Sequence, residues 1–229
     1  MTRPLFRVLQ LSALAVVCAA SVGHAQIINL STGLSGGVAL PAGAVDPFWT
    51  TSINGGATFQ PTFVLGDAFN TPCGCGIIAN SPFGQWINAT GVIGSSWPIG
   101  PTVYTDRTFN LAGYDLNTVS LSGSWSTMDS NLGLYLNGIL IPGTTLLFPS
   151  TNPWQSLHSF AFSGAANFNA GINTLEFRST TVNGIYDGVM ISDGLVQGQL
   201  TSTPEPASIV LLATGLAGLA IAARRRRVV

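Results

Sequence analysis

The sequence predicts an all-β fold, with one β-sandwich domain between an N-terminal signal peptide and one C-terminal transmembrane helix. Three observations predict it. Apolar and polar residues alternate over much of residues 26–198, turn-forming dipeptides separate these runs, and apolar stretches with basic flanks stand at both ends. We therefore expect a signal peptide at 1–25, an ectodomain at 26–198, a linker at 199–203 and a tail at 204–229.

The first segment has the pattern of a secretory signal peptide. Arg3 and Arg7 precede an apolar stretch at residues 11–20, and Gly23-His24-Ala25 has the small-x-small form of a cleavage site. The apolar stretch is too short for a stop-transfer helix. We expect cleavage between Ala25 and Gln26.

The β-sandwich prediction rests on alternation with a period of two residues. Apolar positions share one face in two runs, Val119/Leu121/Gly123/Trp125 and Leu132/Leu134/Leu136. Asn137-Gly138 then predicts a hairpin turn into residues 139–141. Shorter alternating runs follow around Phe160 and Phe162, Leu175 and Phe177, and Val189 and Ile191. Because none of these runs has a helical period, the prediction is all-β.

The charge of the exported part excludes one class of partner. Residues 26–203 contain no lysine and two arginines, Arg107 and Arg178, against eight acidic residues, so their formal charge is −6. A domain with so few cations lacks the basic surface that binds nucleic acid or an anionic membrane. We therefore expect no nucleic-acid partner.

The C-terminal tail combines a short polar motif, an apolar helix and a basic cluster. Pro204-Glu205-Pro206 precedes residues 207–223, which carry no charge, and Arg224-Arg225-Arg226-Arg227 follows. As a helix, residues 207–223 would be about 25 Å long, the short end of what a bilayer core requires. The arginines would stay on the cytoplasmic side and fix the orientation.

This order of segments resembles the PEP-CTERM sorting tail of Gram-negative bacteria. The resemblance implies recognition, and cutting, by exosortase, a membrane protease-transpeptidase. Pro204, Glu205 and Pro206 would form the sorting and processing motif, and Arg224, Arg225, Arg226 and Arg227 the membrane stop. It also implies transient anchoring in the membrane, a final place at the cell surface or in the extracellular matrix, and a host that makes extracellular polysaccharide.

The tail type is also labelled as an ice-binding protein C-terminal domain. An ice-binding surface protein is therefore an alternative. The chain, however, lacks the regular Thr-x-Thr ladder of a flat ice-binding face.

A second resemblance covers about residues 45–198. The motifs that carry it are Asp46-Pro47-Phe48-Trp49, Trp86-Ile87, Trp97-Pro98-Ile99, the segments 104–111 and 122–129, Leu136-Asn137-Gly138 and the segment 170–177. They resemble a galactose-binding-like jelly roll. Such domains bind ligands in some proteins and are structural in others, so the resemblance implies a fold and leaves the function open.

Cysteine and histidine give little sign of a metal or cofactor. Cys73-Gly74-Cys75 predicts a small disulfide in an exported protein, with a redox or metal role as the alternative. His158 is the single histidine after residue 25, which makes a zinc site a poor fit. We expect no metal and no cofactor; calcium held by loop oxygens would need a spaced aspartate motif that the sequence lacks.

Carboxylates are the remaining candidates for catalysis. A glycosidase needs two of them at a set separation, and Asp106, Asp115 and Asp129 are the candidates. Asp115 and Asp129 stand among turn-forming residues, and no Gly-x-Ser-x-Gly motif indicates a hydrolase. We expect no enzyme. The alternative is an accessory domain of a carbohydrate-active enzyme, or a weak glycosidase.

Tryptophans are candidate sugar contacts, because a flat indole suits the apolar face of a pyranose. Trp125 is in phase with Leu121 and is expected to be buried. Trp86, Trp97 and Trp154 stand next to Gly, Ser or Pro, which allows exposure, so they are the candidates for glycan contact, although plain packing is the favoured interpretation. The sequence therefore predicts an exported, non-enzymatic surface or matrix protein that associates with exopolysaccharide.

Overall fold

The computed structural model describes residues 25–66, 76–92, 102–180, 188–201 and 214–218. Residues Ala25–Gln199 form one compact unit, here called the ectodomain. Residues 214–218 are helical, and they are the one part of the expected helix at 207–223 that is described. Within the described ranges, no helix is long and apolar enough to cross a membrane. Most of the predicted signal peptide, the Pro204-Glu205-Pro206 motif and the four arginines lie outside the described residues.

The described ectodomain consists of strands joined by turns and three short 3₁₀ helices. The strands are β1 (Ala25–Asn29), β2 (Leu34–Ser35), β3 (Val38–Ala39), β4 (Val45–Ser52), β5 (Gln60–Val64), β6 (Ile87–Asn88), β7 (Thr102–Asn110), β8 (Ser120–Thr127), β9 (Ser130–Leu136), β10 (Ile139–Leu140), β11 (His158–Ser163), β12 (Ile172–Thr180) and β13 (Val189–Gln199). The 3₁₀ helices are η2 (Leu116–Thr118), η3 (Pro153–Gln155) and η4 (Ala165–Asn167).

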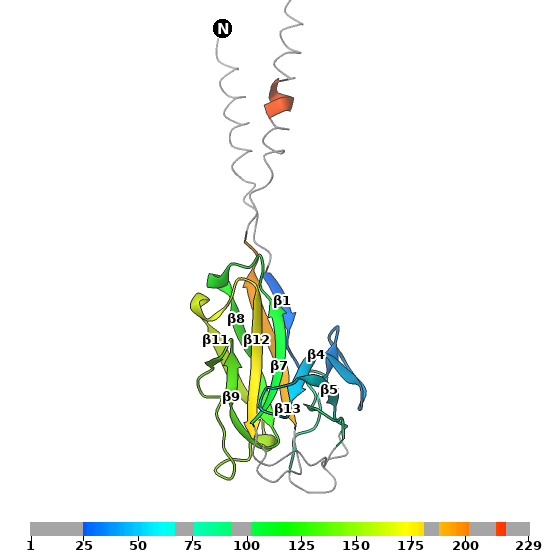
Figure 1. Ribbon diagram of the computed structural model, residues 1–229. Coiled ribbons are helices and arrows are strands. Elements are labelled where there is room, and N and C mark those ends of the chain that lie inside the picture. Colours follow the sequence, from blue (N-terminus) through cyan, green and yellow to red (C-terminus); the bar gives the residue numbers. More distant parts are fainter. Residues whose placement is uncertain (1–24, 67–75, 93–101, 181–187, 202–213, 219–229) are drawn as a thin grey trace, which may run out of the picture. The chain divides into compact units, whose positions relative to one another are not determined.

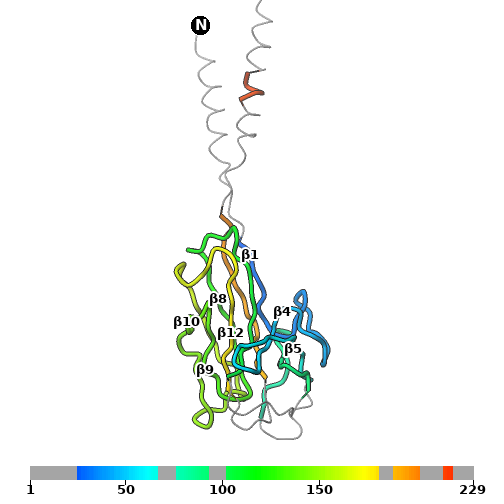
Figure 2. Tube along the Cα trace, viewed as in Figure 1, coloured from blue at the N-terminus to red at the C-terminus, as the bar shows by residue number. Residues whose placement is uncertain are grey.

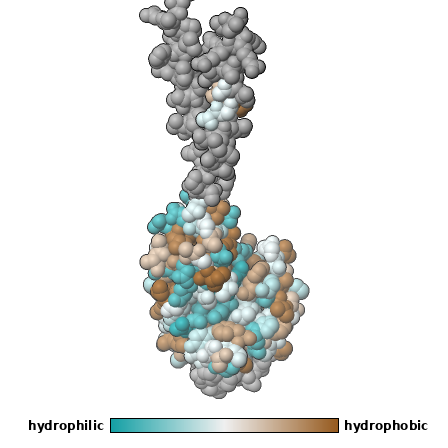
Figure 3. Space-filling view, turned by 45° about the horizontal axis from the view of Figure 1, so that its top comes forward, coloured by the Kyte–Doolittle hydropathy of each residue, from teal (hydrophilic) through white to brown (hydrophobic). Residues whose placement is uncertain are grey.

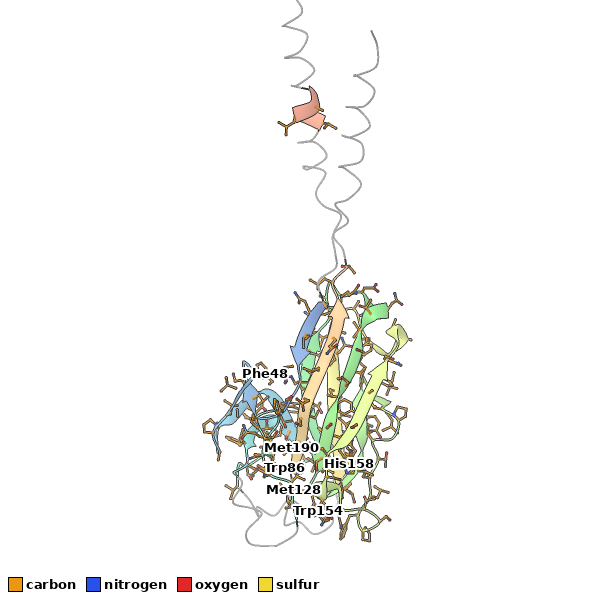
Figure 4. The ribbon with its side chains drawn as sticks, turned by 180° about the vertical axis from the view of Figure 1, so that it is seen from behind. Phe48, Trp86, Met128, Trp154, His158 and Met190 are labelled. Atoms are coloured by element: carbon orange, nitrogen blue, oxygen red, sulfur yellow. The ribbon has the colours of Figure 1, made fainter. Side chains whose placement is uncertain are left out.

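The strands form a sheet that curls into two packed layers. The strand order is β10-β9-β12-β7-β4-β5-β6-β13-β8-β11, with β1 added to β13, while β2 and β3 form a separate hairpin. Figure 1 shows β12 and β7 in front, and Figure 4 shows β13 in front when the molecule is seen from behind. The trace in Figure 2 follows the same two layers. The predicted β-sandwich is confirmed.

The core lies between the layers and is centred on three aromatic side chains. Trp125 of β8 and Phe177 of β12 come from opposite layers, and their ring centroids are 6.3 Å apart. The ring centroids of Trp49 of β4 and Phe177 are 6.2 Å apart. All three are buried, so the predicted burial of Trp125 is confirmed. Aromatic pairs at such distances add to the stabilisation from burial alone.

Most of the predicted alternation is present, and one position differs. Leu134 and Leu136 are buried, whereas Leu132 is only partly buried. The prediction for Leu132 is wrong because the register between β9 and β12 shifts at Arg178/Ser179, which forms a bulge and breaks the period of two. The predicted turn at Asn137-Gly138 is confirmed, with positive φ at both residues, as a tight hairpin of this kind requires.

The N-terminal strand is built into the ectodomain. β1 pairs antiparallel with the end of β13, and Leu30, directly after β1, is fully buried. The Leu30 N–H donates to the Gly194 carbonyl, and the Gly194 N–H donates to Ser31 Oγ at 3.1 Å. Gly194 lies where the register between β13 and β8 shifts, which forms a bulge. The chain that leaves β1 is therefore hydrogen-bonded to β13 at this bulge.

A second, smaller core cluster packs Leu65, Ile77, Trp86, Met128 and Met190 together. Figure 4 shows Trp86, Met128 and Met190 close to one another at the end of the ectodomain away from β1. Methionine suits such a position because its flexible side chain fills irregular gaps.

Candidate functional site

The tryptophans that were candidates for glycan contact lie in different environments. Trp86 is completely buried and donates its indole N–H to the Ile78 carbonyl at 2.8 Å, so it is a packing residue without an exposed face for a glycan. It belongs to the second core cluster, with Met128 and Met190. Trp154 is partly buried, with its ring 5.5 Å from that of Phe148, and Trp97 lies outside the described residues.

Histidine and cysteine give no metal site in the described ranges. His158 lies at the start of β11, as a strand residue, with its ring 5.3 Å from that of Trp125. Within the part of the chain that the structure describes, no group of three His, Cys, Asp or Glu residues could hold a metal ion. Cys73 and Cys75 lie outside that part.

Figure 3 shows hydrophobic and hydrophilic residues interspersed on the visible face of the ectodomain. Single exposed apolar side chains are ordinary on protein surfaces. A functional site is therefore better indicated by converging polar groups, and two such places are found among the described residues of the ectodomain.

The first place is a group on the outer face of β7, β9 and β12, here called the sheet-face cluster. It consists of Tyr104, Asp106, Tyr135, Glu176 and Arg178. Alternate residues of a strand share a face, so β7 supplies Tyr104 and Asp106 while β12 supplies Glu176 and Arg178. In register, Glu176 is opposite Asp106 and Tyr135, and Arg178 is opposite Tyr104.

The sheet-face cluster holds its one cation between two aromatic rings. The Arg178 guanidinium lies 3.8 Å from the Tyr135 ring centroid and 5.5 Å from that of Tyr104. The Arg178 Nε also donates to Glu176 Oε1. These contacts fix the guanidinium, which otherwise has many rotamers, in one orientation.

The two carboxyl groups of the cluster lie on directly opposed residues of β7 and β12. Burial is the main cause that raises the pKa of Asp106 to about 7; the neighbouring Glu176 acts in the same direction, and the charge of Arg178 opposes the shift. A carboxyl with such a pKa exchanges its proton near neutral pH.

The other predicted carboxylates lie elsewhere. Asp115 caps η2, where its side chain accepts from the Asn117 N–H at 3.0 Å, and Asp129 lies buried in the turn between β8 and β9. The structure thus pairs Asp106 with Glu176, a residue that the sequence did not single out. Only the pairing of distant strands reveals this partner.

The second place is a pocket of about 350 Å³ beside β1, here called the Arg107 pocket. Apolar side chains, among them Ile27, Leu34 and Phe48, form most of its wall, and Arg107 supplies a guanidinium. Phe48 is 47% exposed, and the Arg107 guanidinium lies 4.6 Å from its ring centroid. Figure 4 shows Phe48 well apart from the second core cluster.

A buried carboxylate organises one wall of this pocket. Asp46, which is 2% exposed, accepts from Gly33 N at 2.7 Å, Phe48 N at 2.9 Å and Trp49 N at 3.3 Å. These bonds hold the β2–β3 hairpin and the start of β4 together. Burial raises the pKa of Asp46, whereas the backbone N–H groups and the charge of Arg107 act in the opposite direction.

Comparisons with known proteins identify the tail and give weaker likenesses for the ectodomain. Residues 202–227 match the PEP-CTERM protein-sorting motif, as the sequence predicted. No curated protein matches the chain. A native family 35 carbohydrate binding module from Clostridium thermocellum is similar at 16% identity and a TM-score of 0.28, over 49% of this chain and 76% of that one.

Two further solved structures are similar at the same level. A family 35 carbohydrate binding module from an environmental isolate has 15% identity and a TM-score of 0.26, over 52% of this chain and 80% of that one. The ANX2 ectodomain from Arabidopsis thaliana has 13% identity and a TM-score of 0.28, over 45% of this chain and 31% of that one.

Proposed function

We propose that this protein is exported, sorted through its C-terminal tail and retained at the cell surface or in the extracellular matrix, where it associates with exopolysaccharide without catalysing a reaction. The observation that carries the proposal is the PEP-CTERM sorting motif at residues 202–227. The motif implies an exosortase-type membrane enzyme as the processing partner. The signal-peptide pattern at residues 1–25 supports the same route.

In this proposal, the three segments of the tail have different roles in sorting. Pro204, Glu205 and Pro206 are the motif that exosortase recognises and processes. Residues 207–223 anchor the precursor in the membrane, and the four arginines from Arg224 to Arg227 stop translocation. Signal cleavage between Ala25 and Gln26 leaves β1 nearly whole, since only its first residue is removed.

The sheet-face cluster is the proposed contact for glycan. Tyrosine rings offer apolar surface beside a hydroxyl, which suits a sugar ring with its apolar face and hydroxyl rim. Arg178 can donate hydrogen bonds to the hydroxyl groups of a sugar, and Asp106 and Glu176 can accept hydrogen bonds from them. All of these side chains lie on one face of three paired strands, which would allow an extended chain to lie across them.

The positions of the candidate carboxylates favour binding over hydrolysis. Asp106 lies on β7. Asp115 and Asp129, the other carboxylates considered, serve turns on other elements.

Retention on immobilised host exopolysaccharide tests the glycan contact. The exported protein, purified from cells, is compared with its Tyr104→Ala/Tyr135→Ala variant, and we expect the variant to lose retention because both rings that orient Arg178 are gone. Tyr114→Ala, which removes a tyrosine next to η2, is the matched control and is expected to keep retention. Equal retention of the double variant and the unmodified protein would refute the sheet-face contact.

A further inference from the structure

We propose that the Arg107 pocket is a second binding site, which takes an acyl substituent of a sugar, such as an N-acetyl group. The inference rests on the proposed association with glycan, but it concerns different residues from those of the sheet-face cluster. It assigns a chemical class of ligand to a pocket of about 350 Å³, a size that suits a single substituted sugar residue.

The first step is that Arg107 lacks hydrogen-bond acceptors. Its side chain is 7% exposed, and its one hydrogen bond among the described residues runs from Nη1 to the Ser31 carbonyl at a long 3.4 Å. Its Nε is buried without a partner in the described part of the chain. A guanidinium has five N–H donors, and buried donors are normally satisfied.

The second step is that the charge of Arg107 is already compensated. Burial lowers the pKa of Arg107 to about 10, and the negative charge of Asp46 opposes this shift, so the guanidinium stays protonated at neutral pH. The oxygens of Asp46 accept from the backbone N–H groups of Gly33, Phe48 and Trp49 instead of from Arg107. Arg107 therefore lacks a hydrogen-bond acceptor, whereas a negative charge is already nearby. An anionic ligand would bring a second negative charge close to that of Asp46.

The third step is the apolar wall. Ile27, Leu34 and Phe48 line the pocket around the guanidinium. A ligand that fits must join a neutral acceptor to a small apolar group. An acyl substituent does so, because its carbonyl oxygen can accept from Arg107 while its methyl group packs against the apolar side chains.

The expected ligand therefore differs from an unsubstituted hexose and from a uronic acid. A plain hexose offers hydroxyl groups but no methyl group for the apolar wall. A uronic acid offers a carboxylate, whose charge would have to be accommodated near Asp46. N-acetylglucosamine, glucose and glucuronate separate these three chemistries at similar ligand size.

The test is calorimetric or NMR titration of the exported protein with each of the three sugars. We expect binding of N-acetylglucosamine at least about tenfold tighter than that of glucose or glucuronate, as one hydrogen bond to a charged group together with a buried methyl group implies. Equal binding of glucose, tighter binding of glucuronate, or no binding of N-acetylglucosamine would each overturn the proposal.

Three variants locate the site. Arg107→Met keeps an apolar side chain of similar length and is expected to abolish N-acetylglucosamine binding. Phe48→Ala is expected to weaken binding, whereas Phe59→Ala removes a phenylalanine of similar exposure, 45% against 47%, and leaves binding unchanged. Binding that survives Arg107→Met in a folded variant would overturn the assignment.

The result is separable from the proposed function. Loss of exopolysaccharide retention in the Tyr104→Ala/Tyr135→Ala variant with normal N-acetylglucosamine binding supports both sites. Retention on exopolysaccharide without any N-acetylglucosamine binding removes this inference and leaves the sheet-face contact in place.

Discussion

Ala25 lies directly opposite Gln199 in the antiparallel pair of β1 and β13. The first and last residues of the compact unit Ala25–Gln199 are therefore neighbours across two paired strands. The pairing continues to Asn29 opposite Leu195. The chain thus enters and leaves this unit at neighbouring positions.

The β1 segment contributes to stability through one buried residue. We predict that Leu30→Ala lowers the free energy of unfolding by about 2–5 kcal/mol, because Leu30 is fully buried in the main core. Ile27→Ala, on the same segment but at a residue that is 62% exposed, is the control and is expected to change it by about 0.5 kcal/mol or less. Urea unfolding followed by tryptophan fluorescence measures both. Similar values for the two variants would contradict the described burial.

The raised pKa of Asp106 makes stability depend on pH. The folded-state pKa of Asp106 is raised from 3.8 to about 7, chiefly by burial. Between these values the folded protein holds more protons than the unfolded chain, so stability falls as pH rises and levels off above about 7. The raised pKa of Asp46 acts with the same sign.

Asp106→Asn tests this dependence. We predict that the variant loses much of the fall in unfolding free energy between about pH 5 and about pH 8, because an amide cannot ionise. Chemical unfolding at several pH values measures the slope. An unchanged slope in the variant would show that Asp106 is not the group responsible.

The wall of the Arg107 pocket depends on Gly33. Its φ is +69°, and an added Cβ would lie 2.6 Å from Gln85 Cβ. We predict that Gly33→Ala costs about 1–2 kcal/mol of backbone strain and a further loss from the steric overlap. Gly36→Ala is the matched control, since its φ is +58° but an added Cβ meets nothing within 4 Å. Thermal unfolding distinguishes them, and a smaller loss for Gly33→Ala than for Gly36→Ala would contradict the contact.

The sequence predicts those parts of the fold that depend on local pattern. The hairpin at Asn137-Gly138 and the burial of Leu121, Trp125 and Phe177 follow from turn chemistry and alternation. Leu132 departs from the pattern because a bulge depends on the partner strand, which the local sequence does not specify. The burial of Trp86 likewise depends on residues from distant parts of the chain, among them Met128 and Met190.

Neither candidate site could be predicted from the sequence. Glu176 meets Asp106 through pairing of strands about 70 residues apart in the chain, which fixes the pair only after folding. Arg107 occupies a core-facing position of β7, where a pattern-based reading expects an apolar residue. The sorting motif at 202–227, in contrast, is a linear signal, so the sequence alone identified it.

Sorting through the C-terminal tail is the central claim, and the processing of a Glu205→Ala variant in the native host tests it most directly. Intact mass and cell fractionation would be measured for this variant, for the unmodified protein, and for Asp115→Ala, which removes the same charge outside the tail. We predict that the Glu205→Ala precursor stays uncut in the membrane, while the other two proteins reach the surface or matrix without residues 207–229. Normal trimming and release of the Glu205→Ala protein would contradict the account.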